Sequence, residues 1–197
     1  MKWEYLLTEL VYRRFSKPLA RILSKTGVSP NLITIIATIV GLGAAAVIAS
    51  GEIYWGVLTL FISQILDCTD GDLARLTGRV TRKGAYLDRV FDRFVDAAIV
   101  IGMVYLYPAE LWLAGFMAVV GSFGVSITRA MAEAEGAECK VGIGGRDTRL
   151  AIIMVGLLYG YASGSAVNVY LATLWIVAIL GFITTIHRMI HTLKQLD

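Results

Sequence analysis

The feature that most constrains this chain is a series of long apolar runs separated by connections of two different kinds. Hydrophobic residues make up 57% of the chain and charged residues only 17%, whereas a soluble domain normally has about 25% charged residues. Because about 20 helical residues cross a bilayer, the sequence predicts an all-α membrane protein with six transmembrane helices. The six runs begin at Leu32, Ile53, Ala97, Glu110, Leu150 and Val167.

The basic residues fix the expected orientation of these helices. All 18 Lys and Arg residues lie in the N-terminal segment, in residues 75–93, in residues 129–149 or near the C-terminal end. The remaining connections, GEIYWG, YPAE and YASGSAVN, contain none. With six crossings the basic regions share one face, which the positive-inside rule makes cytoplasmic. We therefore expect a multi-pass protein of the cell membrane, with both termini and the active site on the cytoplasmic side. Its net charge of +3 then reflects a rim facing anionic headgroups, and no nucleic-acid partner is expected.

Residues 3–25 are expected to form an amphipathic helix lying in the membrane interface. Its apolar stripe consists of Leu6, Leu7, Leu10, Val11, Phe15, Leu19, Ile22 and Leu23, and its basic side of Arg13, Lys17, Arg21 and Lys25. Pro18 should bend this helix, which we interpret as an anchor without a catalytic role. The segment is too charged for a cleaved signal peptide. The sequence thus predicts a single membrane domain over residues 1–197, with an interfacial helix in 1–28 and a six-helix bundle in 29–197.

Four aspartates lie where two of the apolar runs meet their cytoplasmic connection. Asp67 and Asp70 are three residues apart and Asp88 and Asp92 are four apart, so each pair shares one face of its helix. The adjoining apolar runs are too short to span a bilayer without these turns. Because the connection over 71–83 is short, we expect the two helices to be antiparallel neighbours whose four carboxylates converge.

Two interpretations of these acids differ in what neutralises them. On a soluble helix, ion pairs with Arg75, Arg89 and Arg93 would be the ordinary explanation. At membrane depth an ionised Asp costs about 2.5–3.5 kcal/mol, and converging carboxylates also repel one another. Hard divalent cations relieve both problems, and a two-metal site suits phosphoryl transfer. The pattern therefore favours a metal site, with Asp72 and Asp96 outside it as ion-paired neighbours.

The spacing of these residues resembles the signature of the integral-membrane CDP-alcohol phosphotransferases. That signature is Asp, two residues, Asp-Gly, two residues, Ala-Arg, eight residues, Gly, three residues, Asp, three residues, Asp. Every gap matches in this chain, at Asp67, Asp70, Gly71, Ala74, Arg75, Gly84, Asp88 and Asp92. The resemblance implies transfer of a phosphoalcohol unit from a CDP-alcohol, of the CDP-lipid type, to a hydroxyl acceptor with release of CMP. It also implies two divalent ions, Mg²⁺ or Mn²⁺, a general base at Asp92, metal ligands at all four aspartates, and a homodimer.

The same resemblance assigns contacts to the CDP-alcohol donor. Gly71 and Arg75 match positions that contact its CDP portion, and Thr81 matches a hydroxyl position near it. The stretch SPNLIT, before the first predicted crossing, also resembles the family. There Asn31 and Thr34 would reach the nucleotide end of the donor.

A second cluster of basic residues lies in CKVGIGGRDTR, between the fourth and fifth predicted crossings. Lys140, Arg146 and Arg149, with the N–H groups of the intervening glycines, would suit an anion, and Arg129 lies at the end of the preceding helix. The alternative is a basic loop facing lipid headgroups. Family members that use phosphorylated acceptors carry basic residues in this region, so the resemblance favours a phosphorylated polyol, such as an inositol phosphate, over a plain polyol.

Two other classes of protein remain to be weighed against this hypothesis. A membrane prenyltransferase also uses Asp-rich metal sites for diphosphates, but it places them in two separated motifs, and nothing here supplies the second. A divalent-cation channel or transporter would need polar groups continuing to the far side, where the predicted helices are apolar.

Overall fold

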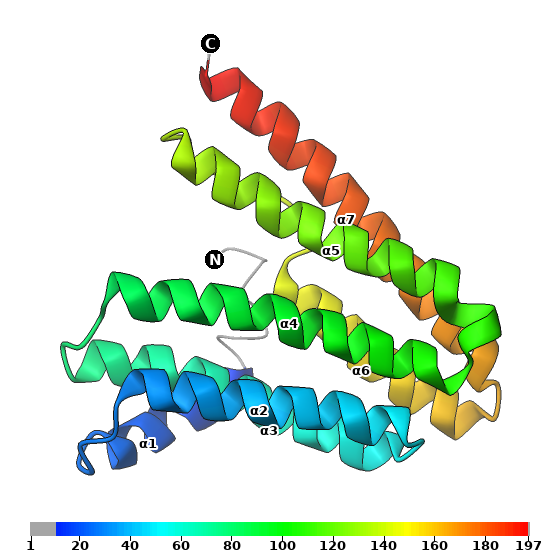
Figure 1. Cartoon of the computed structure of the whole chain (residues 1–197), viewed down its shortest axis with the longest axis horizontal. Coiled ribbons are helices and arrows are strands. Elements are labelled where there is room, and N and C mark those ends of the chain that lie inside the picture. Colours follow the sequence, from blue (N-terminus) through cyan, green and yellow to red (C-terminus); the bar gives the residue numbers. More distant parts are fainter. Residues whose placement is uncertain (1–10, 197) are drawn as a thin grey trace. The chain divides into compact units, whose positions relative to one another are not determined.

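The computed structural model describes residues 11–196, and this part of the chain is helical without any strand (Figure 1). Three residues of the predicted N-terminal stripe, Leu6, Leu7 and Leu10, lie outside the described residues. The helices are α1 (Arg13–Leu23), α2 (Pro30–Ala49), α3 (Ile53–Leu76), α4 (Arg82–Leu106), α5 (Pro108–Ala134), α6 (Arg146–Ser163) and α7 (Ala166–Leu196).

Helices α2 to α7 coincide with the six predicted apolar runs. Three of them, α2, α5 and α7, are long and apolar enough to cross a membrane. The all-helical class is therefore confirmed, while the count of six crossings stays a prediction. Helices α3 and α4 extend beyond their apolar parts through the Asp-bearing turns, as the sequence had indicated.

Polar residues fix where two of these helices begin. The Ser29 side chain accepts a hydrogen bond from Leu32 N at 3.3 Å, and Pro30 occupies the first turn of α2, two features that are typical of helix starts. At α4, Thr81 Oγ1 accepts from Gly84 N at 3.0 Å. Both starts lie in segments that the sequence had assigned to donor binding.

The described chain divides into two compact units, residues 11–102 and residues 103–196. In the first, α2 packs against α3 and α4 at positions without a side chain. A Cβ at Gly41 would lie 2.7 Å from Val95 Cγ1, and one at Gly102 would lie 2.5 Å from Ala45 O. Ser63 Oγ donates to Ala37 O at 2.9 Å. Small residues that let helices approach closely are typical of membrane helix packing, and here they hold α3 and α4 beside α2.

Helix α1 belongs to the same unit. Its buried Ala20 forms a small core with Ile33 of α2 and Leu73 of α3. Near its beginning, the ring centroids of Tyr12 and Phe61 lie 5.6 Å apart. The amphipathic helix is thus present from residue 13, includes Pro18 in its interior, and is packed onto α3, the helix that carries Asp67 and Asp70.

In the second unit, α5 and α7 run side by side (Figure 1). A Cβ at Gly181 would lie 2.8 Å from the carbonyl carbon of Gly121, and one at Gly124 would lie 2.7 Å from Thr185 Oγ1. These backbones therefore meet almost directly. Helix α6 also packs on α7, where Tyr170 Oη donates to Leu157 O at 3.3 Å.

Candidate active site

Three aspartates from two helices converge in the first unit. Asp67 and Asp70 come from α3 and Asp88 from α4, and each offers one carboxylate oxygen within 4.8 Å of the other two. The Asp70 side chain is buried, at 7% exposure, and the other two are half-buried. Three of the four carboxylates that were predicted to converge therefore do so in the structure.

This donor set fits a hard divalent cation. All the converging atoms are carboxylate oxygens, the ligands that Mg²⁺ and Mn²⁺ prefer over nitrogen or sulfur. Negative charges held this close, with one group almost out of water, repel one another, and a divalent cation between them removes that cost. Neither Cys68 nor Cys139 belongs to the group of converging ligands.

Asp92, the fourth aspartate of the signature, is not part of this close group in the described chain. It lies one helical turn after Asp88 on α4 and so on the same face. Its carboxylate is half-buried, and its Oδ2 accepts a hydrogen bond from Arg93 Nη2 at 3.3 Å. Its roles as general base and metal ligand stay predictions.

Thr34 reaches one of the metal-ligand candidates directly. Thr34 is 5% exposed, and its hydroxyl donates to Asp70 Oδ2, with the carbonyl of Pro30 as a second acceptor at 3.2 Å. Since a hydroxyl has one proton and the bond to a carboxylate is the stronger, the contact to Asp70 dominates. The sequence had assigned Thr34 to the nucleotide, and the link to Asp70 was missed.

Asn31 and Thr81 meet above the backbone of Gly84. A Cβ at Gly84 would lie 2.8 Å from Asn31 Oδ1 and 3.1 Å from Thr81 Oγ1. Both polar side chains are exposed, and Gly84 precedes Asp88 by one turn. The absence of a side chain at Gly84 thus makes room for two candidate donor contacts.

Arg75 lies against Gly71, the residue that follows Asp70. A Cβ at Gly71 would be 3.2 Å from Arg75 Nη2 and 3.3 Å from Nη1. The guanidinium also forms an ion pair with Asp72, at 2.8 Å between Nη2 and Oδ1. The ion pair predicted for Asp72 is therefore confirmed, whereas that for Asp96, which is 7% exposed, stays a prediction.

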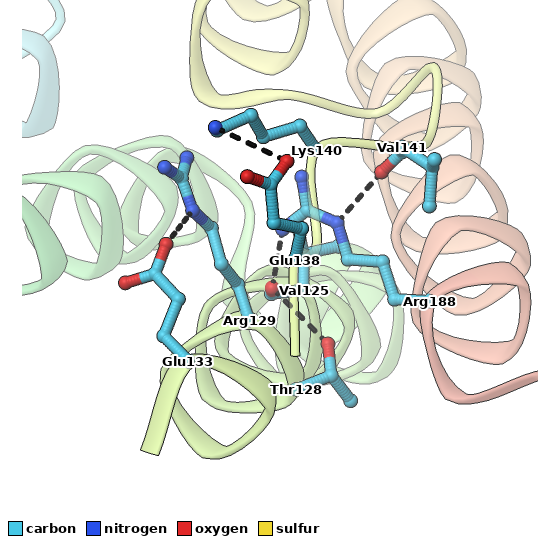
Figure 2. A network of polar contacts seen from close by, with 8 residues as sticks. All are labelled: Val125, Thr128, Arg129, Glu133, Glu138, Lys140, Val141 and Arg188. Carbon is cyan, nitrogen blue, oxygen red and sulfur yellow. Dashed lines mark hydrogen bonds and ion pairs between the residues drawn. The ribbon is translucent and has the colours of Figure 1, made fainter. Parts of the chain in front are cut away.

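The predicted basic cluster lies in the second unit, around the segment that joins α5 to α6. Arg129 Nε pairs with Glu133 at 2.8 Å, and Lys140 Nζ with Glu138 at 3.5 Å (Figure 2). Arg149 is 3% exposed, and its Nη1 donates to Gly144 O at 2.5 Å. The fourth residue of the prediction, Arg146, is half-buried in the first turn of α6.

Arg188 of α7 joins this region and was missed in the sequence. It is 4% exposed; its Nε donates to Val141 O at 2.8 Å and its Nη1 to Val125 O at 2.6 Å (Figure 2). Thr184, one turn earlier, accepts from Gly144 N at 2.9 Å. The sequence did contain one signal for Arg188, since it lies just beyond the last apolar run. A cation that is buried at such a position requires specific hydrogen-bond partners.

The all-helical fold and the three converging carboxylates are what is expected of a membrane-associated phosphotransferase, and comparison with known proteins supports this class. A model of the CDP-alcohol phosphatidyltransferase family matches residues 27–186, so the chain belongs to this family of enzymes. The resemblance found in the aspartate signature is thereby confirmed. The family match therefore favours this enzyme class over the prenyltransferase and cation-channel alternatives.

Particular relatives share nearly the whole chain. An archaetidylinositol phosphate synthase of Methanothermobacter thermautotrophicus is 36% identical, over 94% of this chain and 92% of its own. A phosphatidylinositol phosphate synthase of Mycobacteroides abscessus is 30% identical, over 93% and 86%.

Solved structures of the Mycobacterium tuberculosis phosphatidylinositol phosphate synthase are also similar. The one with CDP-DAG bound has a TM-score of 0.82 and 27% identity, covering 91% of this chain and 94% of that one. The same enzyme in complex with manganese and citrate also has a TM-score of 0.82, with coverage of 90% and 88%.

Proposed function

We propose that this enzyme transfers a phospholipid unit from a CDP-lipid to the hydroxyl group of an inositol phosphate and releases CMP. The observation that carries the proposal is the convergence of Asp67, Asp70 and Asp88 in a chain of the CDP-alcohol phosphatidyltransferase family. The acceptor is supported by relatives whose names specify inositol phosphate products and by the basic cluster.

The three converging aspartates, together with Asp92, would hold two Mg²⁺ or Mn²⁺ ions. When bound, these ions would neutralise the diphosphate of the donor and stabilise the charge that develops on CMP as it leaves. Burial of Asp70 and its bond from Thr34 orient one ligand of the set before any substrate arrives.

Asp92 is proposed as the general base. A half-buried carboxylate at this position would accept the proton of the acceptor hydroxyl as that oxygen attacks phosphorus. A new P–O bond to the acceptor forms, and the P–O bond to the CMP oxygen breaks. Arg93 donates to Asp92 Oδ2 at 3.3 Å, a contact that would help to orient this carboxylate.

Contacts to the donor nucleotide are proposed for the exposed polar groups beside the aspartates. Asn31 and Thr81 present their oxygens together above Gly84. Thr81 accepts from the start of α4 and keeps its own proton to donate. Arg75 and Gly71 would border the diphosphate.

The acceptor phosphate is proposed to bind the basic cluster of the second unit. Five cations form this candidate site, because Arg188 is added to those expected from the sequence. Arg149 and Arg188 are buried and donate to carbonyls of the glycine-rich segment, which supports a preformed, positively charged loop. The five are Arg129, Lys140, Arg146, Arg149 and Arg188.

The proposed setting is the cell membrane, with a single domain, six crossings and the active site on the cytoplasmic side. The distribution of Lys and Arg supports this orientation. Residues 1–28 would contain the interfacial helix and residues 29–197 the bundle. A homodimer is proposed from the family resemblance.

The test is a CMP-release assay on the purified protein with ester-linked and ether-linked CDP-lipids and Mg²⁺ or Mn²⁺. Inositol phosphate, inositol and glycerol phosphate are compared as acceptors. We expect turnover with inositol phosphate, and none in an Asp67→Asn, Asp70→Asn double variant. Turnover only with unphosphorylated acceptors would remove the role of the basic cluster. Absence of CMP release from every combination would refute the proposed function.

A further inference from the structure

One buried carboxylate next to the metal-ligand candidates lies outside the family signature. Asp72 follows Gly71 on α3, and its side chain is 8% exposed. A charge this well buried is costly unless it is paired and hydrogen-bonded. Its partners therefore indicate what it does.

The two oxygens of this carboxylate are held by different helices. Asp72 Oδ2 accepts from Ser16 Oγ of α1 at 2.6 Å, and Oδ1 accepts from Arg75 Nη2 of α3 at 2.8 Å. Ser16 is itself completely buried, at 0% exposure. Because both oxygens are fixed, the carboxylate cannot rotate without breaking a charge-assisted bond.

Arg75 differs from its partner in being open to a ligand. Its side chain is 57% exposed, and an exposed arginine normally moves among many rotamers, so that its ion pair contributes little. Here a rigid carboxylate holds one edge of the guanidinium, and the missing side chain at Gly71 lets the group lie against the backbone beside Asp70.

We propose that Asp72 and Ser16 are positioning residues that hold the Arg75 guanidinium over Gly71 for the diphosphate of the CDP-lipid donor. The interfacial helix α1 is then a part of the donor site and more than an anchor. This inference rests on the proposed function, because it assigns Arg75 to the donor of that reaction.

The packing of α1 supports this role. Ala20, one turn after Ser16, is completely buried against Ile33 and Leu73, so the Ser16 hydroxyl is delivered by a helix that is fixed in place. A helix that only lay on lipid would not need a fully buried serine opposite a buried carboxylate.

The experiment measures the dissociation constant of a CDP-lipid in detergent, together with the KM and kcat of CMP release. In Asp72→Asn the amide NH₂ replaces one carboxylate oxygen and faces either Ser16 Oγ or Arg75 Nη2, both of which are donors. One of the two hydrogen bonds is therefore lost. We expect about tenfold weaker donor binding for this variant and a smaller loss for Ser16→Ala. The half-saturating Mn²⁺ concentration and the kcat at saturating donor should stay close to those of the wild type.

The matched control is Ser24→Ala, at the end of the same helix, where the hydroxyl donates only to Arg21 O. A second readout separates positioning from folding. In an Arg75→Ala background, Ser16→Ala should produce no further loss of donor affinity, because the interaction it supports is already absent. Thermal unfolding of each variant shows whether the fold persists.

Three outcomes are distinguished. The inference is supported if the wild type binds the donor, if Asp72→Asn and Ser16→Ala each bind it more weakly, and if Ser16→Ala causes no further loss of affinity in the Arg75→Ala background. If both variants bind donor as tightly as Ser24→Ala, or if Ser16→Ala weakens binding equally without Arg75, the inference is wrong and the proposed function stands. If the wild type neither binds nor turns over any CDP-lipid, the proposed function itself fails.

Discussion

Removing the Thr34 hydroxyl tests whether the metal site depends on a residue that binds no metal. Thr34 donates to the buried oxygen of Asp70, and Thr34→Val keeps nearly the same shape while deleting this donor. Outer hydrogen bonds to a metal ligand are worth about 10–100-fold in metal affinity. Because Pro30 O competes for the same proton at 3.2 Å, we expect the lower end, a loss of about tenfold, or roughly 1.4 kcal/mol.

The assay is direct binding of Mn²⁺, followed by electron paramagnetic resonance of the free ion, so that turnover is not required. Thr38→Val is the matched control. Its hydroxyl lies one turn further on the same helix and donates to Thr34 O at 2.8 Å, within α2. Thr34→Ser keeps the donor and should bind Mn²⁺ almost as the wild type does. Equal Mn²⁺ affinity in Thr34→Val and Thr38→Val would refute the reasoning.

Three further predictions follow from the same geometry. Asp92→Asn should lower CMP release by about 10²–10⁴-fold, the usual contribution of a general base, with an unchanged elution volume and circular dichroism; wild-type turnover would remove Asp92 as the base. Gly71→Ala should raise the KM for the CDP-lipid, because its Cβ would displace the end of Arg75, while the midpoint of thermal unfolding changes little. Arg188→Met should leave two carbonyls without their donor and lower the free energy of unfolding by about 1–3 kcal/mol. It should also raise the KM for inositol phosphate, measured beside a denaturation series; an unchanged KM would separate Arg188 from the acceptor.

The aspartate cluster was predictable because its determinants are local. Spacings of three and four place Asp67 with Asp70, and Asp88 with Asp92, on single helix faces, and a short connection brings α3 and α4 together. The apolar runs likewise marked the six long helices. Periodicity and loop length are properties of neighbouring residues, which is why they can be read without a structure.

Other parts of the site depend on contacts between residues far apart in the chain. Ser16 and Asp72 are 56 positions apart, and Thr34 and Asp70 are 36 apart. Each hydroxyl has an ordinary local use in a helix, so nothing near it in the sequence indicates a carboxylate partner. Arg188 was missed for the same reason, since its acceptors lie on α5 and on the segment before α6.

The glycines of this enzyme differ in how well they should tolerate substitution during evolution. At Gly71 the nearest obstacle is the end of the Arg75 side chain, which can move aside by giving up its bond to Asp72, so that alanine is open to selection at a kinetic cost. At Gly121 and Gly181 the obstacles are main-chain atoms of the opposite helix, which cannot move without separating α5 from α7. A single substitution at either glycine would therefore disrupt the contact between α5 and α7. We expect homologues that descend from this sequence to keep both glycines, unless the packing of the two helices changes as a whole.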